Sequence, residues 1–304
     1  MAASEEMAAF VRVADKGSFA DAARDLGLTP SALSKLVTRL EDRIGVRLMT
    51  RTTRRLSLTM EGKAFLARAR DVLALIEVAE TEASATRRKP KGHIRVNTGT
   101  AFARHRLAPL LPAFLAAFPE ITVDLTVTDR RIDPVAEQVD VVFRAGELGD
   151  STLIARKIMD GSRTICAAPA YLAARGTPST PGDLLNHNCL VVQGLARLTI
   201  WPFQAGDGIN RLEVSGDLTS DSADLLLDMA LAGHGIVRLS GFVVEKAISD
   251  GRLVELFADV HASEPVPIWA LTIPGRHRAL RVQALVDFVA NAMSARTRAS
   301  LISP

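Results

Sequence analysis

Hydrophobic positions in the first 45 residues recur every three or four positions, which predicts three short amphipathic helices. The first helix ends near Gly17, and Ser18 and Thr29 are suited to cap the second and the third. Pro30 then occupies the first helical position, where its missing N–H costs nothing. The predicted buried positions, in helix order, are Met7, Phe10, Val11 and Ala14; Phe19, Ala22, Ala23 and Leu26; and Leu33, Leu36, Val37, Leu40 and Ile44.

The third predicted helix keeps its polar residues away from this stripe. Ser31, Lys35, Thr38 and Asp42 lie on the opposite face, and Ser34 and Arg39 lie at its flanks. Two short helices joined by a Gly-containing turn match a helix-turn-helix, whose second helix enters the DNA major groove. Small polar side chains in the first turn would permit close approach, and Lys35 and Arg39 would hold phosphates or bases. A surface helix of an ordinary bundle is the alternative.

A basic stretch follows these helices. Residues 43–60 contain five arginines and no acid, and strand patterns at 48–51 and 54–58 turn at Thr52 and Thr53. Alone, such a run indicates only a solvated basic surface. Beside a helix-turn-helix it predicts a β-wing that follows phosphates or enters the minor groove, and the combination is more specific than either part.

A long helical pattern extends from residue 60 to about residue 89, with Thr59 as its cap. Its single apolar stripe predicts a coiled-coil-like dimer contact, and packing against the C-terminal part of the same chain is the alternative. A basic segment with Pro and Gly, residues 86–92, is the expected linker. The stripe consists of Phe65, Leu66, Ala69, Val72, Leu73, Ile76, Ala79 and Ala83.

From residue 92 onward, strand-like and helix-like runs alternate, which predicts an α/β domain with a largely parallel sheet. The 304 residues allow two or three domains, and a hydrophobic content of 48% indicates a globular chain. Residues 1–91 hold 17 Lys and Arg against 12 Asp and Glu, so the basic charge gathers at the N-terminal end. No secretory signal or membrane-spanning run is visible, which together with two cysteines favours the cytoplasm.

Three segments carry a resemblance to a known family: SFADAARDLGLTPSALSKLVTRLEDRIGVRLMTRTTRRLSLTMEG, AYLAARGTPSTPGDLLNHNCL and ALAGHGIVRL. The first resembles the winged helix-turn-helix of the LysR-type transcriptional regulators, and the match extends over nearly the whole chain. The resemblance implies double-stranded promoter DNA and a small-molecule effector as partners, with a homodimer or dimer of dimers as the assembly. RNA polymerase is a further expected partner, and no cofactor, metal or membrane is expected.

The resemblance also implies an architecture and a set of DNA contacts. A winged helix-turn-helix (1–58) and a linker helix (59–91) precede an effector domain (92–304) like a type 2 periplasmic binding protein. Its first lobe comprises 92–161 and 267–304, and its second lobe comprises 162–266. The family more often has Ser-Gln-Pro in the first turn, so a glutamine contact to adenine is missing here. By motif position, Thr29, Pro30, Ser31, Ser34 and Lys35 would face the groove, and Arg51, Thr53 and Arg54 would meet the backbone.

Candidate effector contacts lie in loops that follow predicted strands, where open α/β sheets bind ligands. Thr98 and Thr100 offer hydroxyls beside free helix N–H groups, and Arg144 offers a fork for a carboxylate. Thr128 and Asp221 lie in two further loops of this kind. Together they favour a small organic anion. Alternatively, Thr98 ends a strand, Arg144 pairs with Glu147 or Asp150, and Asp221 and Asp224 cap a helix.

Other classes of function have weaker support. Ser222, Asp228 and His234 lie close in sequence, but without the G-x-S-x-G turn of a hydrolase. Cys166 and Cys189 allow a redox-responsive regulator if they pair, although no basic residue adjoins either thiol. A solute-binding protein on the α/β domain is a further alternative. The favoured mechanism is that effector binding closes the lobes and changes the spacing of the paired heads on DNA.

Overall fold

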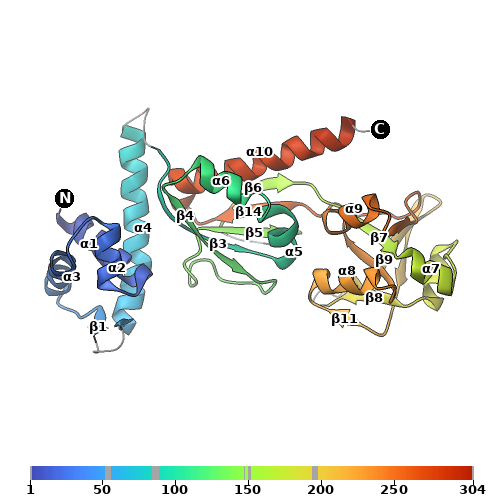
Figure 1. Ribbon diagram of the computed structural model, residues 1–304, viewed down its shortest axis with the longest axis horizontal. Coiled ribbons are helices and arrows are strands. Elements are labelled where there is room, and N and C mark those ends of the chain that lie inside the picture. Colours follow the sequence, from blue (N-terminus) through green and yellow to red (C-terminus); the bar gives the residue numbers. More distant parts are fainter. Residues whose placement is uncertain are drawn as a thin grey trace.

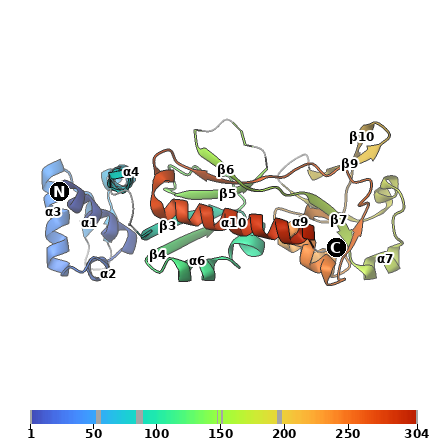
Figure 2. The ribbon, with the colours of Figure 1, turned by 90° about the horizontal axis from the view of Figure 1, so that it is seen from above.

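The computed structural model describes residues 2–51, 56–83, 89–146, 148–149, 152–193 and 198–302. The molecule is elongated, with a helical head at one end, an upright long helix beside it, and two α/β lobes beyond (Figure 1). Helix α10 (Leu280–Ile302) runs along the lobe next to the head, as the view from above shows (Figure 2).

The head consists of α1 (Ala2–Lys16), α2 (Phe19–Asp25) and α3 (Pro30–Ile44). Both predicted caps are confirmed: the Ser18 hydroxyl accepts from Asp21 N at 3.3 Å, and the Thr29 hydroxyl accepts from Ala32 N at 3.2 Å. The apolar faces of the three helices meet in one core, as their spacing predicts. Its most buried members are Ala9, Phe10, Val13, Ala22, Ala23, Leu33, Val37, Leu40 and Leu48.

The wing is a two-stranded antiparallel ribbon of β1 (Met49–Arg51) and β2 (Leu56–Leu58). The predicted second strand began two residues earlier, at positions outside the described residues. Glu41 of α3 anchors the ribbon: its carboxylate is 4% exposed and accepts from Leu48 N at 2.8 Å and from Met49 N at 3.0 Å. These bonds fix the start of the wing against the third helix.

Helix α4 (Met60–Ala83) begins where predicted, because the Thr59 hydroxyl accepts from Gly62 N at 2.8 Å. The predicted use of its apolar stripe is wrong in part. Phe65 packs edge-on against Phe10 of α1 at 5.6 Å, and Leu66 belongs to the same buried cluster, so this part of the stripe covers the core of the head. The cause is that a helix lying on the head must bury its most apolar face there first. Two members of the predicted stripe, Val72 and Ala79, stay exposed and form an exposed line with Ala64, Arg68 and Leu75.

The lobe beside the head contains a five-stranded sheet in the order β4-β3-β5-β14-β6. Helices α6 (Leu111–Ala117) and α10 pack against it through Phe114 and Phe288, whose rings lie 5.4 Å apart. Its strands are β3 (Gly92–Thr98), β4 (Ile121–Val127), β5 (Val141–Ala145), β6 (Ile154–Met159) and β14 (Ile268–Thr272).

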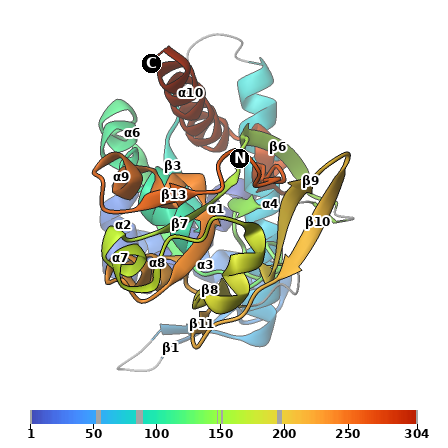
Figure 3. The same ribbon diagram turned by 90° about the vertical axis from the view of Figure 1, so that its right-hand side faces the viewer.

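The distal lobe contains a second five-stranded sheet in the order β11-β8-β12-β7-β13. A hairpin of β9 (Ile200–Ala205) and β10 (Gly208–Glu213) projects from it (Figure 3), and β10 was not predicted. Its strands are β7 (Arg163–Ala167), β8 (Cys189–Val192), β11 (Thr219–Ser220), β12 (Ile236–Ser240) and β13 (Val254–Leu256). Its helices are α7 (Pro169–Arg175), α8 (Ala223–Leu231), α9 (Gly241–Ser249) and a 3₁₀ turn, Pro181–Asn186.

The prediction of a largely parallel sheet is wrong, because both sheets are mixed. In the first sheet, β3 pairs in parallel with β4 and β5, whereas β14 is antiparallel to both β5 and β6. The chain leaves this lobe after β6 and returns through β14, so these two strands must run in opposite directions. The same mixture occurs in the second sheet, where β7 is antiparallel to β12 and β13.

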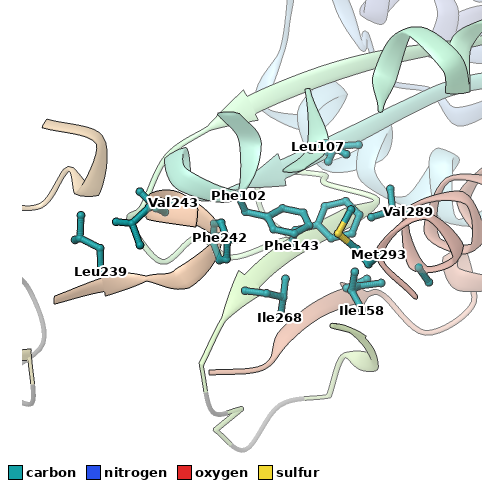
Figure 4. Packing of buried hydrophobic residues seen from close by; sticks show 14 of the residues in the cluster. Phe102, Leu107, Phe143, Ile158, Leu239, Phe242, Val243, Ile268, Val289 and Met293 are labelled. Carbon is teal, nitrogen blue, oxygen red and sulfur yellow. The ribbon is translucent and has the colours of Figure 1, made fainter. Parts of the chain in front are cut away.

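One hydrophobic cluster joins the two lobes (Figure 4). Phe102 and Phe143 of the first lobe lie 5.4 Å apart between ring centroids, and Phe102 meets Phe242 of α9 edge-on at 6.4 Å. Leu239 and Val243 belong to the same buried cluster. The lobes are therefore in apolar contact through residues of β5, β12 and α9.

Candidate functional site

The first turn of α3 presents the predicted groove-facing residues to solvent. Thr29, Pro30, Ser31 and Lys35 are exposed, whereas Ser34 is half-buried. The hydroxyls of Thr29 and Ser31 lie 3.1 Å apart, within hydrogen-bond distance. Arg39 is also exposed, one turn beyond Lys35. This surface is small and polar at its N-terminal end and cationic further along, which suits a helix that approaches base edges and phosphates.

Two arginines of the basic stretch 43–60 have side-chain partners within the head. Arg43 donates to Glu6 at 3.1 Å, and Arg47 donates to the buried carboxylate of Glu41 at 2.9 Å. These two therefore also hold the head together, which the run of arginines in the sequence did not reveal. Arg51 ends β1, and Thr53 and Arg54 lie outside the described residues.

The predicted effector site contains an acid that sequence analysis missed. The backbone N–H of Thr100 donates to Asp129 Oδ1 at 3.1 Å, and the Thr100 hydroxyl binds the same carboxylate. A Cβ at Gly99 would lie 2.7 Å from Asp129 Oδ1, so only glycine admits this approach. Burial raises the pKa of Asp129, against the opposing effects of the Thr100 N–H and Arg144. The carboxylate of Asp129 thus occupies the position in which an anionic ligand was expected.

Arg144 lies beside this carboxylate at the end of β5. Its guanidinium is half-buried and donates to the carbonyl oxygens of Phe143 at 3.0 Å and Arg130 at 3.1 Å, and to the side-chain oxygen of Asn97. Burial lowers the pKa of Arg144, while the charge of Asp129 opposes this shift. Its predicted alternative partners, Glu147 and Asp150, lie outside the described residues.

The two remaining threonines are less available than predicted. Thr98 is fully buried and donates to Gly99 O at 3.3 Å, in agreement with the alternative that it ends a strand. The Thr128 hydroxyl accepts from Arg130 N at 3.3 Å and is half-buried. Of the predicted effector contacts in the first lobe, Thr100 and Arg144 therefore remain the best placed.

In the distal lobe, the predicted capping role of Asp221 and Asp224 is wrong. Helix α8 begins at Ala223, so Ser222 is the cap, and its hydroxyl accepts from Leu225 N at 3.2 Å. Asp221 is exposed, and its charge is one of the smaller influences that raise the pKa of Asp129. Asp224 is buried and accepts from His105 Nε2 at 2.7 Å, across the boundary between the lobes.

Ion pairs also cross this boundary, which we call the lobe seam: Arg104 lies 3.5 Å from Asp224, and Arg106 pairs with Glu245. Both terminal nitrogens of Arg106 donate to the carboxylate of Glu245, at 2.7 and 2.6 Å, and the guanidinium lies over the ring of Phe242 at 5.3 Å. Arg106 belongs to a π-helical turn, Ala103–Leu107. Such a turn adds one residue to a helical repeat and redirects the side chains that follow. Helical periodicity in the sequence did not single out this contact.

The residues of the enzyme alternative have other partners. Ser222 caps α8. His234 pairs with Asp217, whose Oδ1 lies 3.0 Å from His234 Nε2, and not with Asp228 as the enzyme alternative requires. Within the described ranges, no three His, Cys, Asp or Glu side chains are grouped to bind a metal ion. Of the helices that the structure describes, none combines the length and hydropathy needed to span a bilayer.

The two cysteines lie on opposite sides of one sheet. Strand β12 separates β7 from β8, which places Cys166 and Cys189 two strands apart, about 9.5 Å at the usual strand spacing. A disulfide requires Cα atoms within about 7 Å. Burial raises the pKa of each thiol to about 12, so both thiols stay protonated at neutral pH. This geometry gives no support to a Cys166–Cys189 switch.

Comparisons with known proteins agree with this architecture. Residues 4–63 match the bacterial regulatory helix-turn-helix of the lysR family, and residues 87–294 match the LysR substrate-binding domain. The chain is 37% identical over 286 residues to the HTH-type transcriptional regulator CrgA of Neisseria meningitidis serogroup C (strain 8013), covering 94% of this chain and 95% of that one. It is 31% identical over 285 residues to DmlR of Escherichia coli (strain K12), covering 93% and 92%.

Solved structures show the same arrangement. The structure of CrgA from Neisseria meningitidis has a TM-score of 0.65 at 36% identity, with 95% of this chain and 98% of that chain covered. Full-length AphB, a virulence activator of Vibrio cholerae, has a TM-score of 0.58 at 25% identity, with 94% and 98% covered. The chain therefore belongs to the LysR family of transcriptional regulators, with a helix-turn-helix head and a two-lobed effector-binding domain.

Proposed function

We propose that this regulator binds promoter DNA by inserting the first turn of α3 into the major groove, and that a small organic anion between the lobes modulates that binding. The observation that carries the proposal is the exposed turn from Thr29 to Lys35, fixed beside the wing by the buried carboxylate of Glu41. Ser31 and Ser34 would contact bases. Lys35 and Arg39 would contact bases or phosphates, and Arg51, Thr53 and Arg54 would meet the backbone.

The working unit in this proposal is a homodimer, or a dimer of dimers, that reaches its operator in the cytoplasm and contacts RNA polymerase there. Support for pairing comes from α4, whose exposed line includes Val72 and Leu75, 40% and 55% exposed. Two chains joined along this line would carry two recognition helices to half-sites about one DNA turn apart. Within each chain we assign 1–58 to the head, 59–91 to the linker and 92–304 to the effector domain, divided into 92–161 with 267–304 and 162–266.

DNA binding by single-residue variants tests the first half of the proposal. Ser31→Ala should change the preference among operator bases, whereas Arg54→Ala should weaken binding to all sequences and reduce the salt slope by about 0.9. Fluorescence anisotropy over a salt series measures both. Arg156→Ala, which removes an arginine paired with Asp287 far from the head, is the control and should leave affinity unchanged. Equal losses from Ser31→Ala on every operator would contradict the base contact.

The proposed anion would take the place of the Asp129 carboxylate. Thr100 already offers its N–H and hydroxyl to that carboxylate, and Arg144 adds a positive charge beside it. An effector carboxylate would accept the same bonds once Asp129 moves away. Anion binding at this site would also affect the electrostatic interaction between the lobes, because the charge of Asp224 in the second lobe raises the pKa of Asp129 in the first.

The variant Asp129→Asn tests this ligand class. Asparagine keeps the shape and one acceptor oxygen but removes the charge that competes with an anion, so small carboxylates should bind more tightly than to the wild type. Cationic ligands should bind less tightly. A thermal-shift screen of carboxylates and amines, followed by calorimetry, measures the change. Asp160→Asn, which alters an exposed acid paired with Lys157, is the control. Weaker carboxylate binding by Asp129→Asn would contradict an anionic effector.

A further inference from the structure

A cavity lies away from the lobe seam, where the head, α4 and the first lobe meet. We call it the junction cavity; its volume is about 210 Å³. Its wall includes α1 of the head, α4, and β3 of the first lobe, together with the 3₁₀ turn Arg276–Arg278. Five arginines line it, against two aspartates, Asp15 and Asp140. The arginines are Arg12, Arg70, Arg95, Arg276 and Arg281.

The aspartates in and around this wall are shared among several guanidinium groups. Asp15 Oδ1 accepts from Arg95 at 2.7 Å and also from Arg70. Arg276 donates to Asp71 of α4 at 2.8 Å, and Arg12 pairs with Asp25 at 3.0 Å. Each guanidinium has five N–H donors, so these few carboxylates cannot accept a hydrogen bond from every donor.

Two of the remaining donors are buried without an acceptor. Arg276 is 4% exposed, and its Nη1 has no hydrogen-bond partner, since the nearest Asp140 oxygen is 3.6 Å away. Nη1 of Arg70 is likewise buried and has no hydrogen-bond partner, and neither nitrogen is accessible to solvent. Buried donors without acceptors are destabilising and rare in folded proteins. An oxyanion would accept from these two nitrogens only after the guanidinium groups turn towards the cavity. Arg12 and Arg95, with side chains 28% and 22% exposed, line the cavity and are open to a ligand without such a turn.

We propose that the junction cavity is a binding site for a small oxyanion with two negative charges, such as phosphate or a dicarboxylate. Guanidinium groups favour this chemistry because their planar forks match pairs of oxygens in phosphate and carboxylate groups. The volume lies below the range of about 300 to 1,000 Å³ that holds drug-sized ligands, which selects a small anion over a nucleotide.

An anion in this cavity would contact the head and the first lobe at once. Arg12 belongs to α1, Arg70 to α4 and Arg95 to β3, so one ligand would bridge three parts of the chain. It would stabilise the orientation in which these parts are docked, to the extent that it binds this orientation better than others. The effect on DNA binding rests on the proposed function, whereas anion binding itself does not.

Calorimetric titration of the full chain with inorganic phosphate and with malonate, at constant ionic strength, tests the site. The wild type should bind one anion per chain. Arg12→Gln combined with Arg281→Gln should weaken binding at least tenfold, and Arg156→Gln should leave it unchanged. Ala8→Leu keeps every charge but narrows the cavity, and it should also weaken binding. Circular dichroism spectra that match the wild type would show that each variant is folded.

Either of these results would overturn the proposal: absence of saturable binding of both anions to the wild type, or equal weakening by Arg156→Gln and by the Arg12 and Arg281 variant. Binding of phosphate alone, or of malonate alone, that the Arg12 and Arg281 variant weakens would support the site and identify its ligand as phosphate or carboxylate. Binding that this variant leaves intact would belong to the site between the lobes and would contradict the proposal. Anion titration without DNA stays informative if the chain fails to bind any operator. Failure of the proposed function and failure of this site are therefore distinguishable.

Discussion

Arginines connect separate parts of the molecule both at the lobe seam and around the junction cavity, but their carboxylate partners are arranged differently in the two regions. At the seam, Arg106 places both terminal nitrogens on one carboxylate, that of Glu245, and covers the ring of Phe242. At the junction, Arg70 and Arg95 share Asp15, and Nη1 of Arg276 has no hydrogen-bond partner. At the seam, both terminal nitrogens of Arg106 have acceptors within the chain, whereas at the junction some guanidinium donors have none.

This difference indicates which interactions stabilise each of the two regions. The seam adds a bidentate pair to a continuous apolar cluster, and apolar burial needs no ligand (Figure 4). The junction surrounds a cavity and depends on directional contacts between charged groups. We therefore expect the seam to respond mainly to mutation and the junction to respond to both mutation and anions.

The largest expected effect comes from breaking the seam with Arg106→Ala. The side chain is 8% exposed, and its loss leaves Glu245 without its partner and uncovers Phe242. Because Glu245 remains 55% exposed, we expect the free energy of unfolding to fall by about 2 to 3 kcal/mol, below the cost of breaking a fully buried pair. Urea unfolding followed by tryptophan fluorescence measures it.

The matched control for the seam is Arg156→Ala, which removes an exposed pair with Asp287 and should cost no more than about 0.5 kcal/mol. If both variants lost the same stability, the seam would contribute no more than a surface ion pair. The contrast between the two regions would then fail.

A smaller effect is expected at the junction from Asp15→Asn. Asp15 is 14% exposed and serves two arginines, but asparagine keeps one acceptor oxygen for them, so we expect the free energy of unfolding to fall by only about 1 to 2 kcal/mol in anion-free buffer. Phosphate should restore part of this loss, because an anion can replace the missing charge. Thermal unfolding with and without phosphate measures both. Asp21→Asn, at an exposed pair with Arg24, should show neither effect.

The smallest effect is a pH dependence carried by the distal lobe, away from both regions. Burial and the neighbouring Arg238 lower the pKa of His261 to about 4 from 6.5. Between these values the unfolded chain binds the proton and the folded chain does not, so stability falls as the pH falls from 6.5 towards 4. Since the ring is only partly buried, we expect a loss of less than about 1 kcal/mol between pH 7 and pH 5.

His261→Gln isolates this contribution, because glutamine keeps an acceptor for Arg238, which donates to the ring at 2.9 Å. The pH dependence of its urea midpoint should be shallower than that of the wild type. An identical pH dependence would assign the acid sensitivity to another group.

The head was the most predictable part of the molecule. Its caps at Ser18 and Thr29 and the helix start at Pro30 involve atoms within four positions along the chain, and the structure confirms all three. The wing strands followed from local alternation. Glu41 was missed, because its role as an acceptor for Leu48 and Met49 depends on how the wing folds back onto α3.

The effector region was predictable only in outline. Strand ends identified Thr100 and Arg144, but the sequence offered no signal that Asp129 would bond to Thr100, 29 positions away. The direction of β14 was also missed, because it depends on the chain returning from the distal lobe.

The sequence by itself determined most of the elements, the basic head and the family, since helical spacing, caps and local charge act within a few residues. Only the tertiary structure decided which charges meet: Arg106 and Glu245 are 139 positions apart, and Arg276 and Asp71 are 205 apart. Such pairs arise because the chain crosses twice between the lobes and folds back onto its own linker helix. The physical reason is that an ion pair requires closeness in space, which periodicity along the chain does not encode.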